Sequence, residues 1–130
     1  MISADTNLFA RLLLKDDPAQ YRRAVALLAA SDEVFVPVTV LLELAWVLRI
    51  RDSTREEIVS SLRAILAMPH VKPQHPEAVH RALDWVEQGV DIADAFHLAL
   101  SDKATMFFTF DATLARRATK LGVRPSVMAP

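Results

Sequence analysis

Two aspartates follow directly after short apolar runs that are typical of strands. Asp5 comes after residues 1–4, and Asp111 comes after residues 105–110. If both runs are parallel strands of one sheet, both aspartates lie at its carboxyl edge, where open α/β sheets bind ligands. A lone Asp at such a position is more often a helix N-cap. Helix capping does not require two negative charges close together at one edge of a sheet, so this placement favours a ligand-binding site.

Glu43 is a third candidate, because it lies in an otherwise apolar helical stretch, residues 40–48. A helix that is apolar all round is expected to be buried in its domain. An ionised carboxylate there is costly unless a cation or hydrogen bonds compensate it. Two interpretations of Glu43 stay open. It pairs with an Arg or accepts a hydrogen bond from a Ser or Thr hydroxyl as an ordinary structural residue, or it belongs to a binding site.

A fourth acid, Asp94, lies three residues after Asp91 in a stretch of helical period, residues 90–100. Asp91 is the natural N-cap of this helix, which leaves Asp94 on the first turn. Its small alanine neighbours leave room for a ligand to approach. A lone histidine in such a helix is more often a hydrogen-bonded core residue than a ligand, so His97 is not included in the site.

These four acids share one possible chemistry, which is metal-assisted hydrolysis. If Asp5, Glu43, Asp94 and Asp111 converge, their mutual repulsion raises their pKa values unless divalent cations neutralise them. All-oxygen ligands favour Mg²⁺ or Mn²⁺ over zinc. Such an ion lowers the pKa of a bound water and stabilises the charge that develops when a phosphodiester is hydrolysed, so no protein nucleophile is needed.

The composition excludes several classes of protein. A chain of 130 residues has room for one domain, and we expect residues 1–130 to form a single domain. Hydrophobic residues make up 52% of the chain, which is enough to bury a core and argues against disorder. The formal net charge of -1 excludes a polycation that coats nucleic acid by charge alone.

Residue types that are absent or rare exclude further kinds of functional site. The chain has no cysteine, which excludes disulfides, thiolate zinc sites and cysteine nucleophiles and fits the cytoplasm. Its two glycines cannot supply a glycine-rich phosphate loop. We expect no signal peptide, because residues 1–5 lack a basic segment followed by an apolar one. We expect no membrane span, because Pro37 and Glu43 interrupt the longest apolar stretch.

The elements that must position the four acids follow an alternating pattern. Short β-branched or aromatic runs alternate with segments of helical period, which is typical of βαβ units around a parallel sheet. We therefore expect an α/β fold with about five parallel strands, at residues 1–4, 34–37, 71–73, 105–108 and 123–127. Four helices are expected at residues 18–30, 53–67, 76–88 and 112–121. The second begins with a capping box at residues 53–56. The last two end at Gly89 and Gly122, which we expect to be left-handed C-caps.

The acids and their neighbours resemble the four sequence blocks of PIN-domain proteins, and in particular of VapC-type ribonuclease toxins, over nearly the whole chain. The first block is Asp5-Thr6-Asn7, and Glu43 in residues 39–48 is similar to the helical glutamate of the family. The stretch from Asp91 to residue 99 resembles the third block, in which the second aspartate, Asp94, belongs to the site. The last block is Phe107-Phe108-Thr109-Phe110-Asp111.

This resemblance implies a PIN-like three-layer fold in which a five-stranded parallel sheet lies between helices. It implies a Mg²⁺- or Mn²⁺-dependent endoribonuclease, a homodimer, and a cognate antitoxin protein that occludes the site. Asp5, Glu43, Asp94 and Asp111 are then the catalytic and metal-binding acids. The supporting residues are Asn7, Thr109, which offers a hydroxyl, and Asp91, which is either a ligand or only a helix cap.

Binding of RNA also requires cations near the acids. Arg116 is the best candidate for a phosphate contact, because it lies on the helix that begins at Asp111. The other basic clusters are interpreted as solvated helix faces. His70, His75 and His80 are interpreted as surface histidines, since a step of five residues does not keep them on one helix face.

Two other functions stay open. A metal-dependent phosphatase of the haloacid-dehalogenase type needs a second aspartate two positions after the first, and Asn7 stands there instead. A PIN-like module that binds RNA or a partner protein without cutting is the other, although the full acidic set argues against a degenerate site. Apolar residues such as Leu12, Leu13 and Leu14 are candidates for a dimer or antitoxin interface, or for ordinary core.

Overall fold

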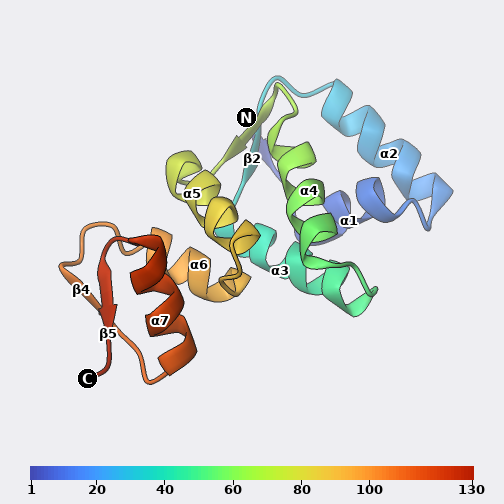
Figure 1. Cartoon of the computed structure of the whole chain (residues 1–130). Coiled ribbons are helices and arrows are strands. Elements are labelled where there is room, and N and C mark those ends of the chain that lie inside the picture. The colour runs from blue at the N-terminus through green and yellow to red at the C-terminus, as the bar shows by residue number, and fades with distance from the viewer. The chain divides into compact units, whose positions relative to one another are not determined.

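The computed structural model describes residues 1–130 as an α/β protein with five short parallel strands and seven helices. Strands and helices alternate along the chain as the sequence predicts (Figure 1). The chain forms two compact units, residues 1–74 and residues 75–130. The prediction of an α/β fold with parallel strands flanked by helices is confirmed.

The first unit contains a three-stranded parallel sheet in the order β1-β2-β3. The middle strand β2 is its most buried part, since Val34 and Val36 have no exposed surface. Four helices accompany this sheet, and α1 packs against both α2 and α3. The elements are β1 (Ile2–Ser3), α1 (Thr6–Leu14), α2 (Pro18–Ala29), β2 (Val34–Val36), α3 (Val38–Ile50), α4 (Arg55–Leu66) and β3 (Val71–Pro73).

Local sequence signals explain where these helices begin. Asp17 caps α2, because its side chain accepts a hydrogen bond from the backbone of Gln20 at 3.0 Å. The capping box of α4 forms between Thr54 and Glu57, one residue later than the sequence predicts. Both registers fit the Ser/Thr-x-x-Glu pattern, and the observed register is the one adopted by a helix that buries Ile58, Val59, Leu62 and Ile65.

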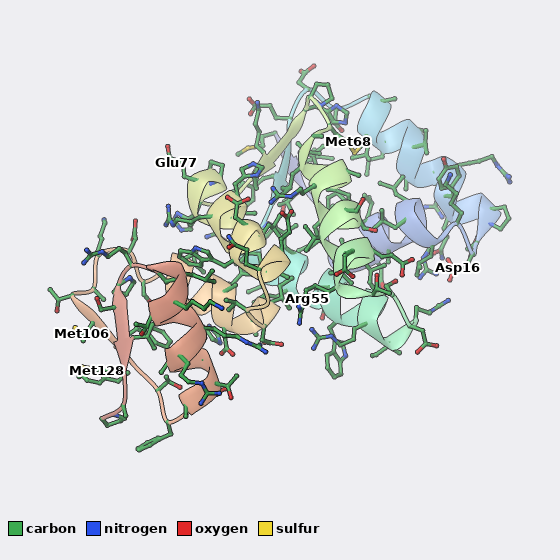
Figure 2. The ribbon with its side chains drawn as sticks, in the orientation of Figure 1. Asp16, Arg55, Met68, Glu77, Met106 and Met128 are labelled. Carbon is green, nitrogen blue, oxygen red and sulfur yellow. The ribbon has the colours of Figure 1, made fainter.

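An ionic contact joins the loop after α1 to the end of α3. Asp16, labelled in Figure 2, accepts from Arg11 at 3.3 Å and from Arg51 at 3.2 Å. Solvent-exposed pairs of this kind stabilise a protein by less than about 1 kcal/mol each. The contact therefore orients the loop more than it stabilises the fold.

The second unit contains two parallel strands and three helices. Its core is formed between α5 and α6 by fully buried side chains that include Leu83, Phe96 and Leu98. Helix α7 packs against β5 (Figure 1). The elements are α5 (Pro76–Glu87), α6 (Ile92–Ala99), β4 (Met106–Phe108), α7 (Ala112–Leu121) and β5 (Ser126–Met128).

The prediction of one five-stranded sheet is wrong, because the five strands form a sheet of three and a sheet of two, one in each unit. Strands of two or three residues offer few ladder hydrogen bonds, and the pairings that form join strands of the same unit. The last strand begins at Ser126 rather than at residue 123. Val123 instead donates its N–H to Ala118 at the end of α7, and Pro125 has no N–H for a ladder.

Candidate active site

Asp5 lies just beyond β1 and caps helix α1. Its Oδ1 accepts a hydrogen bond from the backbone N–H of Leu8 at 3.3 Å, and the residue is exposed. The capping role that the sequence allows is therefore real, and it occupies only one carboxylate oxygen. Asn7, on the first turn of the same helix, is also exposed.

Glu43 takes its position from a hydroxyl in the first helix. The Oγ1 of Thr6 donates a hydrogen bond to Oε1 of Glu43, and Thr6 is only 4% exposed. This is the hydroxyl pairing that sequence reasoning left open for Glu43. It leaves the second oxygen of Glu43 available to another partner.

The prediction that Glu43 is buried is wrong. Helix α3 buries one stripe of side chains at helical spacing, which are Val38, Leu41, Leu44, Ala45 and Leu48. Glu43 lies on the opposite face, which is exposed together with Trp46 and Ile50. A helix with apolar residues on every face does not reveal in its sequence which face is covered.

In the second unit, Asp91 and Asp94 occupy the beginning of α6. Asp91 is the N-cap, and its Oδ2 accepts from the backbone of Ala93 at 3.1 Å. Asp94 is half-buried on the first turn. Partial burial raises the pKa of Asp94, and the negative charges of Asp91 and Asp111 raise it further, while His97 opposes the shift. His97 is exposed and is not the core histidine that the sequence suggests.

Asp111 is the N-cap of α7 and is held from both sides. Its Oδ1 accepts from the backbone of Leu114 at 3.0 Å, and its own N–H donates to Oγ1 of Thr109 at 3.0 Å. Thr109 thus fixes the turn that presents Asp111. Arg116 is exposed on α7, where its Nη2 lies 3.5 Å from Oγ1 of Thr113.

The four acids fall into two pairs, one in each unit. Asp5 and Glu43 belong to residues 1–74, and Asp94 and Asp111 belong to residues 75–130. Neither unit by itself gathers three acidic or histidine side chains at metal-binding spacing. Both pairs consist of hard oxygen donors. This donor set fits Mg²⁺ or Mn²⁺.

Sequence reasoning singled out Glu43 without identifying its partner. Thr6 lies 37 residues before Glu43 in the chain, so no local pattern connects them. Among the histidines, His75 and His80 are exposed as predicted, but His70 is half-buried. The Nε2 atom of His70 is buried without a hydrogen-bond partner.

A model of the PIN domain matches residues 2–120 of the chain. The protein belongs to the PIN-domain family. No curated protein matches the chain. Among solved structures, this PIN domain is similar to the toxin VapC20 of Mycobacterium tuberculosis, which cleaves the sarcin–ricin loop, at 22% identity and a TM-score of 0.46 over the whole of both chains. No helix is both long enough and apolar enough to span a membrane.

Proposed function

We propose that this PIN-domain protein is a Mg²⁺- or Mn²⁺-dependent endoribonuclease and the toxin of a toxin–antitoxin pair of the VapC type. The observation that carries the proposal is that the family match, residues 2–120, includes all four acids that sequence reasoning selected. Each acid lies at the end of a strand or on a helix, where a side chain can be held in one orientation.

The proposal requires the two units to act together. We infer that residues 1–130 form one PIN-like domain whose catalytic and metal-binding acids are Asp5, Glu43, Asp94 and Asp111. The support is that the family match, residues 2–120, includes most of both units. Each unit contributes two of the four acids that the resemblance to the family assigns to the site.

Hydrogen bonds orient three of the four carboxylates. Thr6 holds one oxygen of Glu43, and backbone N–H groups hold one oxygen each of Asp5 and Asp111. A free oxygen remains on each carboxylate for a cation. A bound Mg²⁺ or Mn²⁺ would supply activation of water and stabilisation of charge on the phosphate. Arg116, on the helix that follows Asp111, is the proposed phosphate contact, with Asn7, Asp91 and Thr109 as supporting residues.

The proposal extends to two protein partners, a cognate antitoxin and a second copy of the chain. Large apolar side chains stay exposed on α2 and α3, which are Val25, Leu27, Trp46 and Ile50. Leu12, Leu13 and Leu14 are half-buried and contribute to both core and surface. Light scattering of the purified protein tests the dimer, and a monomer at micromolar concentration contradicts it.

Cleavage of a mixed pool of single-stranded RNA by purified protein tests the proposed activity. We expect cuts with Mn²⁺ or Mg²⁺, none with EDTA, and none with Asp5→Asn. Asn caps a helix as well as Asp does, so the variant keeps its fold. Asp32→Asn, which neutralises an exposed acid of the first unit, is the matched control and cuts normally.

Other results separate the alternatives. Metal binding by folded protein without any cleavage contradicts the nuclease and favours a module that only binds RNA or protein. Hydrolysis of a small chromogenic phosphate ester, without RNA cleavage, favours a phosphatase. Unchanged cleavage by Asp5→Asn contradicts the assignment of the site.

A further inference from the structure

Phe110 is the most exposed large apolar side chain of the protein, at 90% exposure. A single exposed apolar residue is common. Here, however, Phe108 is 59% exposed and Met128 is exposed as well. Phe108 lies opposite Met128 in the ladder of β4 and β5, where Figure 2 labels Met128, and Phe110 follows two residues later. Phe110 lies in the bend that follows β4, so two exposed rings are separated by only one residue.

The backbone on both sides of Phe110 is fixed. The N–H of Thr109 donates to the carbonyl of Met128 at 3.0 Å, which continues the ladder past the end of β4. The N–H of Asp111 donates to Oγ1 of Thr109, and the Asp111 side chain caps α7. Phe110 thus presents its ring from a rigid base, and a Phe ring has few torsions to lose when it binds.

The helix that follows Phe110 has a charge that suits a polyanion. Phe110 directly precedes Asp111, one of the four proposed catalytic acids. The helix that follows, α7, contains three basic residues and no acidic one, and its basic residues are Arg116, Arg117 and Lys120. They are exposed and line an open depression together with Thr113 and Thr119. Arg117 also donates from Nη1 to the carbonyl of Gly89 at 2.6 Å, which leaves Arg116 and Lys120 as the cations for a ligand. Exposed aromatic rings combined with cations are the groups with which proteins hold single-stranded nucleic acid.

We propose that Phe110, with the exposed Phe108 two residues before it, stacks on an unpaired nucleobase of the RNA while Arg116 and Lys120 of α7 contact phosphates of the same strand. This inference rests on the proposed function, and it adds to it a residue that positions the RNA. A protein partner fits the patch less well, because a stable interface buries about 800 Å² on each side, far more than three side chains provide. Stacking tolerates any base, so the contact selects for unpaired rather than particular nucleotides.

Binding of fluorescent single-stranded RNA of about twelve nucleotides, with Ca²⁺ replacing Mg²⁺ to prevent cutting, tests the inference. We expect Phe110→Ala to weaken binding about tenfold and Phe110→Tyr to bind as the wild type does. Phe110→Leu, which keeps apolar surface but has no flat ring, should bind as weakly as Phe110→Ala. Leu100→Ala removes another exposed apolar side chain of the same unit and is the matched control.

An RNA series with one abasic nucleotide at each position supplies a second readout. In the wild type, one abasic position should weaken binding about tenfold, and Phe110→Ala should abolish this difference. Full affinity of Phe110→Ala or Phe110→Leu overturns the inference. If the wild type nonetheless cuts RNA with Mn²⁺, the proposed function survives that result. If the wild type neither binds nor cuts RNA, both fail.

Discussion

At the scale of single residues, the contact between Thr6 and Glu43 determines how one acid is presented. Thr6→Val keeps the shape of a buried side chain and removes the donor that holds Glu43. We expect cleavage to fall about tenfold, because outer-sphere partners of metal-site acids contribute effects of this size. Thr6→Ser should restore the rate. Equal rates in wild type and Thr6→Val, measured as kcat/KM with Mn²⁺, would contradict a positioning role.

Asp94 provides a prediction about pH. Its raised pKa means that the folded protein holds this proton more tightly than the unfolded chain does. The free energy of unfolding of the metal-free protein therefore falls as pH rises above 3.8, the ordinary value for Asp, towards the folded value. Asp94→Asn should raise the melting temperature in EDTA at neutral pH and leave it unchanged in strong acid. A variant that melts below the wild type at neutral pH would show that the Asp94 charge is already compensated.

At the scale of elements, the end of α7 depends on a backbone conformation that suits glycine. Gly122 has φ 66°, and a Cβ atom added there would meet nothing within 4 Å. Gly122→Ala should thus destabilise the protein by about 1 kcal/mol through backbone strain alone. Gly122→Asn should cost less, because Asn tolerates this region. Urea unfolding measures both, and an unchanged midpoint for Gly122→Ala argues against the left-handed cap.

Local signals in the sequence predicted where most helices and strands begin and end, but they did not predict contacts between residues far apart in the chain. Pro18 and Gly122 mark the start of α2 and the end of α7 as expected, because proline and glycine act through their own backbone. The exposed face of α3 was not predictable from a stretch that is apolar throughout. The pairing of Thr6 with Glu43 was not predictable either, since it depends on how α1 packs against α3.

At the scale of the whole molecule, the proposed function requires the four acids, two from each unit, to share one site. If they share it, removing one charge should stabilise the metal-free fold. We expect Asp5→Asn to raise the melting temperature in EDTA, since Asn retains the cap of α1. Added Mn²⁺ should raise the melting temperature of the wild type more than that of the variant. Asp32→Asn, an exposed acid outside the site, should melt like the wild type with and without metal.

Titration of Mn²⁺ into the protein, followed by electron paramagnetic resonance, tests the central claim most directly. Asp5→Asn changes the first unit and Asp94→Asn changes the second. If residues from both units hold one cation, each variant should bind Mn²⁺ about tenfold more weakly or worse, while Asp32→Asn binds normally. Wild-type affinity in either variant would contradict a site assembled from all four acids.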